Sequence, residues 1–167
     1  SGCDNFEYFD LPESLTQIQQ ETFMGCTGLS EMVIPAKVET IGSKAFSGCS
    51  GLTSVTLNDG LKTIGSSAFY GCARLTSIHI PDSVTTIRSS AFMNCSKLAE
   101  CNYPVGWTKA TDSSFYSNVF AGTLLKTLEI PEGIKAIPAN AFSGCDNFEY
   151  FDLPESLTQI QQETFMG

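Results

Sequence analysis

Residues 54–57 read Ser-Val-Thr-Leu, and residues 63–72 read Thr-Ile-Gly-Ser-Ser-Ala-Phe-Tyr-Gly-Cys. Together they belong to one copy of a pattern that fills the chain. Counted from Cys49 as position 0, apolar residues fall at positions +3, +6, +8, +12, +15, +19 and +20, and the next cysteine falls at +23. The units that begin at Cys26 and Cys72 repeat this frame. Matches at so many offsets in consecutive copies indicate a repeat protein.

The same frame divides the 167 residues into seven units: 3–25, 26–48, 49–71, 72–94, 95–121, 122–144 and 145–167. The fifth unit departs from the pattern, and we expect four extra residues around 118–121 before Gly122 takes the cysteine position. Residues 143–167 repeat residues 1–25 letter for letter. This identity indicates either a duplicated block of 142 residues in a parent protein or a chain cut across such a boundary. We therefore expect a fragment of a longer array.

Each unit predicts two short extended segments and a turn. The stretch L-x-x-V-x-I-P alternates apolar and polar residues, which is typical of a short strand that ends at the proline of position +9. The V-x-x-I-G stretch predicts a second extended segment, and S-x-A-F-x-G-C predicts one turn of helix. Because no unit can bury its apolar edge alone, we expect stacked parallel strands on one side and turns and single helical turns on the other.

The motif at residues 75–92, Leu-Thr-Ser-Ile-His-Ile-Pro-Asp-Ser-Val-Thr-Thr-Ile-Arg-Ser-Ser-Ala-Phe, resembles the BspA-type leucine-rich repeats of bacterial and protozoal surface proteins. The resemblance covers all seven units and is weak only at residues 99–121. It implies a leucine-rich-repeat solenoid that is usually on the cell surface or secreted, and often adhesive toward host matrix or other cells. It carries over no catalytic residues, because the shared motif is structural.

The charge balance argues against two classes of partner. Nine Lys and Arg residues against 18 Asp and Glu residues give a net charge of −9, and no basic cluster occurs. The chain therefore has nothing to replace the counterions of a nucleic-acid backbone, and we expect no nucleic-acid partner. No stretch approaches the roughly 18 apolar residues of a membrane-spanning helix, so we expect no membrane insertion.

The seven cysteines follow the repeat. Cys3, Cys26, Cys49, Cys72 and Cys95 are spaced by 23, Cys145 returns in phase, and Cys101 lies off the pattern. This regularity is typical of a small side chain buried once per unit. A strand spacing of about 4.8 Å does not forbid disulfides, but the odd count and the shared inward direction favour free thiols. With no C-x-x-C pair and a single histidine, we expect no zinc site and no other cofactor.

Side chains at positions +5 and +7 alternate with inward residues at +6 and +8, so they line one exposed face, called the strand face below. Its residues are Tyr8, Asp10, Glu31, Val33, Ser54, Thr56, Ser77, His79, Glu100, Asn102, Thr127, Glu129, Tyr150 and Asp152. Five of these fourteen are acidic and none is Lys or Arg. We interpret the face as a binding surface for a basic or hydroxyl-rich protein partner. The alternative interpretation is ordinary strand-surface composition.

The irregular fifth unit supplies further candidates. We expect Tyr116 and Phe120 to be open to a partner, because irregular loops often carry recognition residues. Trp107 holds the inward position +12, so we expect it to fill core space. His79 has no nucleophile at a known catalytic spacing, and we do not assign it as a base.

These observations favour a non-catalytic interaction or adhesion module of a cell-surface or secreted protein. No paired carboxylates, nucleophile with a base or phosphate-binding loop points to an enzyme. The alternative is a structural spacer within a long repeat protein. Because both terminal units present unpaired strands and apolar columns, we also expect head-to-tail association of copies.

Overall fold

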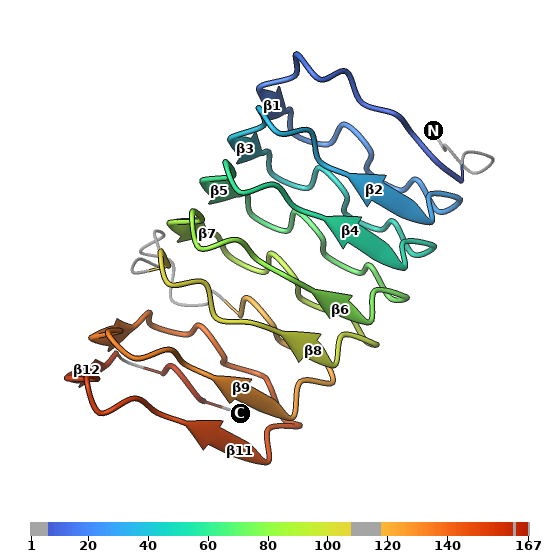
Figure 1. Ribbon diagram of the computed structural model, residues 1–167. Helices are drawn as coiled ribbons and strands as arrows, with labels where there is room; N and C mark the ends of the chain where they lie inside the picture. The colour runs from blue at the N-terminus through green and yellow to red at the C-terminus, as the bar shows by residue number, and fades with distance from the viewer. Residues whose placement is uncertain (1–6, 108–117, 162, 167) are drawn as a thin grey trace.

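The computed structural model describes residues 7–107, 118–161 and 163–166, and the chain coils through them as a parallel β-solenoid (Figure 1). The described residues form short strands and no helix. The strands stand in two columns along the stack. The first column contains β2 (Glu31–Val33), β4 (Ser54–Thr56), β6 (Ser77–Ile78), β8 (Glu100–Cys101), β9 (Thr127–Glu129) and β11 (Tyr150–Asp152). The second contains β1 (Gln17–Ile18), β3 (Thr40–Ile41), β5 (Thr63–Ile64), β7 (Thr86–Ile87), β10 (Ala136–Ile137) and β12 (Gln159–Ile160).

Strands of neighbouring units pair in parallel with a constant shift of 23 residues. Glu31 of β2 lies opposite Ser54 of β4, for example, and Thr40 of β3 lies opposite Thr63 of β5. The strands β1, β3, β5 and β7 form one four-stranded sheet, while β2–β4, β6–β8, β9–β11 and β10–β12 form pairs. Because of this register, residues at one position of the repeat become neighbours along the stack.

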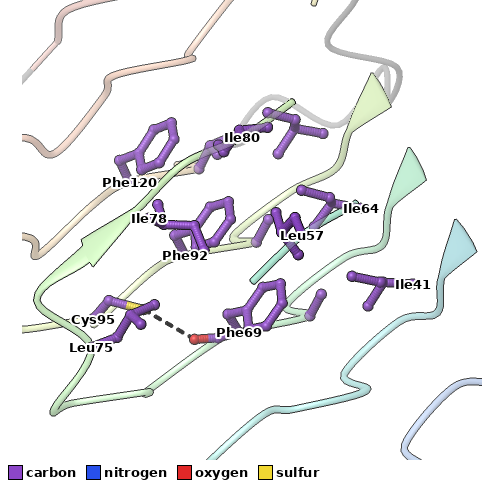
Figure 2. Packing of buried hydrophobic residues seen from close by; sticks show 14 of the residues in the cluster. Ile41, Leu57, Ile64, Phe69, Leu75, Ile78, Ile80, Phe92, Cys95 and Phe120 are labelled. Atoms are coloured by element: carbon purple, nitrogen blue, oxygen red, sulfur yellow. Dashed lines mark hydrogen bonds between the residues drawn. The ribbon is translucent and has the colours of Figure 1, made fainter. Parts of the chain in front are cut away.

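A stack of phenylalanine rings runs through the core, and Figure 2 shows three of its members. The centroids of neighbouring rings are 5.2 Å apart and their planes lie within 7° of parallel along Phe23, Phe46, Phe69, Phe92 and Phe120. The stack continues to Phe142 and Phe165 in steps of 5.8 Å. Buried aliphatic side chains surround these rings, so each unit completes the core of the next.

The cysteine column lies inside, beside the rings. Cys26, Cys49, Cys72, Cys95 and Cys145 are buried thiols that form no disulfide, as predicted, whereas Cys3 lies outside the described residues. The Cys95 thiol donates a hydrogen bond to the Phe69 carbonyl oxygen at 3.1 Å (Figure 2). Burial, assisted by the Asp146 charge, raises the pKa of Cys145 to about 12. The Cys145 thiol therefore stays protonated at neutral pH. All five buried side chains of the column fill the core.

The segment predicted as one turn of helix is instead a run of consecutive turns. The residue at position +18 has a positive φ, 56° at Lys44 and 55° at Ser67, which interrupts a right-handed helix. Alternate backbone N–H groups of this run bond to the next unit, and those between them bond to the residue three positions earlier. The Phe46 N–H, for example, donates to the Ala68 carbonyl oxygen at 2.8 Å.

The predicted place of the four extra residues is wrong. The Phe92 N–H donates to the Val119 carbonyl oxygen at 2.9 Å, and the Phe92 and Phe120 rings stack as in a regular unit. Gly122 has the positive φ of the turn glycine, 70°, and Thr123 follows it in the place of the cysteine. The segment around Phe120 is thus the regular turn, and the additional residues precede it.

Candidate interaction surface on the strand face

The strand face is exposed along the first strand column. In β2 and β9 the outer residues are exposed and the middle residues, Met32 and Leu128, are buried. Strands β4 and β11 alternate in the same way around a half-buried middle residue. Every predicted member is exposed except Asn102, and the exposed set is Tyr8, Asp10, Glu31, Val33, Ser54, Thr56, Ser77, His79, Glu100, Thr127, Glu129, Tyr150 and Asp152. That these residues bind a partner stays a prediction.

The carboxylates of the strand face are not neutralised within the described part of the chain. The ion pairs that the structure shows, Lys44 with Glu21 at 3.8 Å and Lys126 with Glu149 at 2.6 Å, involve residues outside the face. Both are largely exposed, so each stabilises the fold by about 0–1 kcal/mol. The charge of the strand face therefore points into solvent.

Sequence reasoning missed a second acidic column next to the strand face. Position +10 follows position +9, which is a proline in every unit except the third, where it is Asn58. We call the seven residues at position +10 the loop column. Five of the seven are acidic and exposed: Glu13, Asp59, Asp82, Glu132 and Glu155. The other two are Ala36 and Val105, so the loop column also lacks Lys and Arg. The recurrence of acidic residues at position +10 of the repeat is the sequence signal that indicates this column.

The row of exposed side chains is interrupted at Asn102. Its side-chain amide turns toward the preceding unit, where Oδ1 accepts from the Ile80 N–H at 2.7 Å and Nδ2 donates to the Ile80 carbonyl oxygen at 2.8 Å. In the β2–β4 pair the equivalent N–H, that of Ile34, donates to the Thr56 backbone carbonyl. The side chain of Asn102 thus replaces a backbone partner, and this predicted contact residue is structural.

A pocket of about 360 Å³ opens beside Asn102, where three units meet. Its walls are His79, Asp82, Cys101, Asn102, Tyr103, Val105, Glu129 and Pro131. The strand face supplies His79 and Glu129, and the loop column supplies Asp82 and Val105. Three of these residues were predicted to lie on one face, but alternation along a strand does not indicate whether neighbouring units enclose a hollow.

The second set of predicted contacts is corrected by the structure. Phe120 is 2% exposed and lies within the ring stack, so it is a core residue. Phe120 follows Phe92 by 28 residues, which is five more than the usual step of 23. The spacing in the sequence therefore does not reveal that both hold the ring position. Tyr116 lies outside the described residues. Trp107 fills core space as predicted, with its ring edge-on to Phe120 at a centroid distance of 6.3 Å.

The described residues contain no group of three His, Cys, Asp or Glu side chains placed to hold a metal ion. Within the same residues, no helix has the length and apolar character that crossing a membrane requires.

Comparison with known proteins agrees with this repeat. A family model described as the BspA type leucine rich repeat region matches residues 1–118 and 113–167 in six copies. The chain belongs to the BspA-type leucine-rich repeat family. None of the curated proteins matches it significantly.

Three solved structures show the same fold. A leucine-rich repeat protein of T. pallidum is 30% identical with a TM-score of 0.73, and the match covers 87% of this chain and 69% of that one. One from Bacteroides ovatus is 25% identical with a TM-score of 0.70, over 98% of this chain and 49% of that one. A leucine rich cell surface protein of Faecalibacterium prausnitzii is 32% identical with a TM-score of 0.59, over 93% and 49%. This BspA-type chain thus spans about half the length of the last two.

Proposed function

We propose that this chain is a non-catalytic interaction module of a cell-surface or secreted protein, and that its strand face binds a basic protein partner. The observation that carries the proposal is the distribution of charge. Five of fourteen residues on the strand face and five of seven in the loop column are acidic, and neither set contains Lys or Arg, although the chain has nine. The carboxylates of both sets are exposed.

The periodic fold makes this charge effective at a surface. Neighbouring strands lie about 4.8 Å apart, so carboxylates of adjacent units within one column fall within the Debye length of about 8 Å at physiological salt. Their potentials therefore add over several units. Such a surface speeds association with a basic partner and makes the affinity depend on salt.

The surface location rests on the family and on one neighbour. The resembling protein of Faecalibacterium prausnitzii is described as a cell surface protein. A leucine-rich-repeat solenoid also presents an extended face. In the described part of this chain, no group of catalytic side chains lies on it. An interaction role fits these features better than catalysis.

The test is capture of purified extracellular-matrix proteins that range from acidic to basic. We expect the chain to capture basic members, and we expect capture to weaken as salt rises. Reversing Glu31, Glu100 and Glu129 to Lys, each on a separate strand, should lower capture at least tenfold and remove the salt dependence. The melting curve should be unchanged, because all three side chains are exposed.

A matched control changes the net charge equally elsewhere. Reversal of Glu21, Glu39 and Asp146, which are exposed and lie off both acidic columns, should leave capture nearly intact. Equal losses in the two triple variants would show that only net charge matters and would refute a specific face. If the unaltered chain captures nothing above background, the spacer interpretation holds instead.

A further inference from the structure

We propose that the pocket at the fifth unit receives one basic side chain of the partner, and that it prefers arginine. This inference rests on the proposed function of the strand face and assigns an anchor position within it. The pocket is formed by residues of three consecutive units, with His79 and Asp82 from the fourth, Val105 from the fifth and Glu129 from the sixth.

The hollow has a local structural cause. Along the rest of the first strand column the side chains at position +7 point outward, as Thr56 does in β4. At the fifth unit the Asn102 side chain hydrogen-bonds both backbone groups of Ile80, so it does not point outward between its two neighbours in the row. Those neighbours, His79 and Glu129, remain exposed on either side. A side chain of the partner can therefore enter the row at the place of Asn102.

The lining has the chemistry of a cation site with an apolar entrance. The Asp82 carboxylate is fixed by one oxygen, which accepts from the Val105 N–H at 3.0 Å, so its second oxygen can accept from a ligand. The Glu129 carboxylate has no ion-pair partner among the described residues. Val105 is 45% exposed and, with Pro131, offers an apolar wall to the methylene stem of a long side chain.

The origin of the two carboxylates in different elements favours arginine over lysine. Asp82 and Glu129 come from different units, Asp82 on a loop and Glu129 on strand β9, and both line the pocket. A guanidinium group presents several N–H donors in a planar fork and can bond to two carboxylates at once, whereas an ammonium group is a compact point charge. The Tyr103 hydroxyl does not compete for these carboxylates, since it donates to the Trp107 carbonyl oxygen at 2.9 Å.

The experiment is an NMR titration of the chain with the capped peptide Gly-Gly-Arg-Gly-Gly. We expect the largest shifts at the backbone amides of His79, Asp82, Val105 and Glu129, with weaker binding of the lysine peptide. The citrulline peptide has nearly the same shape without the charge, so it should not bind. Shifts spread evenly along the acidic columns, or equal shifts with citrulline, would overturn the proposal.

Matched variants separate the pocket from the general charge of the face. Glu129→Gln and Asp82→Asn should each weaken binding of the arginine peptide at least fivefold. The amide oxygen that Asp82→Asn introduces can still accept from the Val105 N–H, so the loop should keep its shape. Glu100→Gln removes the same charge from the strand face outside the pocket, so it should change the affinity less than twofold. Equal effects of Glu100→Gln and Glu129→Gln would refute a pocket.

The two sets of experiments distinguish failure of the pocket assignment from failure of the proposed function. If the triple reversal abolishes capture of basic proteins but the arginine peptide does not bind in the pocket, the strand face binds and the anchor assignment is wrong. If the peptide binds in the pocket but no basic protein is captured, the proposed function is wrong and the pocket is only a small-cation site.

Discussion

Phe69 has a ring on each side of it. Its centroid lies 5.2 Å from those of Phe46 and Phe92, and none of its surface is exposed. Phe165 holds the same position of the repeat in the last unit, where it stacks on Phe142 and is 37% exposed. The two residues therefore differ in burial while sharing a sequence position.

We expect Phe69→Ala to lower the free energy of unfolding by about 3–5 kcal/mol, because it leaves a cavity that rigid backbone turns cannot close. Phe165→Ala is the matched control and should cost clearly less, since part of that ring already faces solvent. Urea unfolding followed by circular dichroism measures both. A loss below about 1 kcal/mol for Phe69→Ala would contradict the role of the ring stack.

Individual core residues were predictable wherever the repeat keeps its spacing. Met32, Leu128 and Trp107 are buried because the alternation and the frame place them inward. Phe120 was missed because two phenylalanines, Phe115 and Phe120, compete for the ring position of an irregular unit, and only stacking on Phe92 decides between them. Asn102 was missed because its inward turn depends on a hydrogen bond to another unit.

At the scale of elements, the turn after every second-column strand that the structure describes contains one residue in a left-handed conformation. The φ at position +18 is 55° at Ser67, 58° at Ser90 and 55° at Asn140. The strands were predictable from alternation, but the helical turn was wrong. Apolar spacing over one turn cannot distinguish hydrogen bonds within a unit from hydrogen bonds between units.

We expect Ser67→Val to lower the free energy of unfolding by about 1–3 kcal/mol, because a β-branched residue at positive φ is strained. Ser66→Val places the same side chain one residue earlier, where φ is not positive, and serves as the control. Ser67→Asn should be close to neutral, since Asn140 adopts this conformation in the sixth unit. Denaturant melts in which Ser66→Val is the more destabilising of the two valine variants would count against this explanation.

For the whole molecule, the identical segments 1–25 and 143–167 compare one sequence in two surroundings. Ile18 is 3% exposed where the next unit covers it, and Ile160, its counterpart, is 52% exposed. Met24 and Met166 are 50% and 52% exposed, so stacking covers neither. A neighbouring unit thus buries the isoleucine of this segment but not the methionine. In the last unit, a pocket of about 400 Å³ is lined by Phe142, Phe148, Phe151 and Phe165.

We predict that copies of this chain associate head to tail through these terminal faces. Because such contacts do not close, sedimentation over a wide concentration range should show a growing series of species. Ile160→Lys should abolish the series, whereas Met166→Lys, which changes charge at a side chain that stacking leaves exposed, should not. A monomer at every concentration would refute the prediction.

The constant register along the stack also governs how the molecule responds to force. Among the described strands, each is paired only with strands of neighbouring units, so no strand pairing spans the length of the solenoid. When the two ends are pulled apart, the load falls first on the outermost turn, which can peel away without disturbing the next. Each such event should release 23 residues, roughly 80 Å of extended chain, except at the fifth unit, which has 27. We therefore expect the molecule to lengthen under force in nearly equal steps, while the turns still folded keep their surface intact.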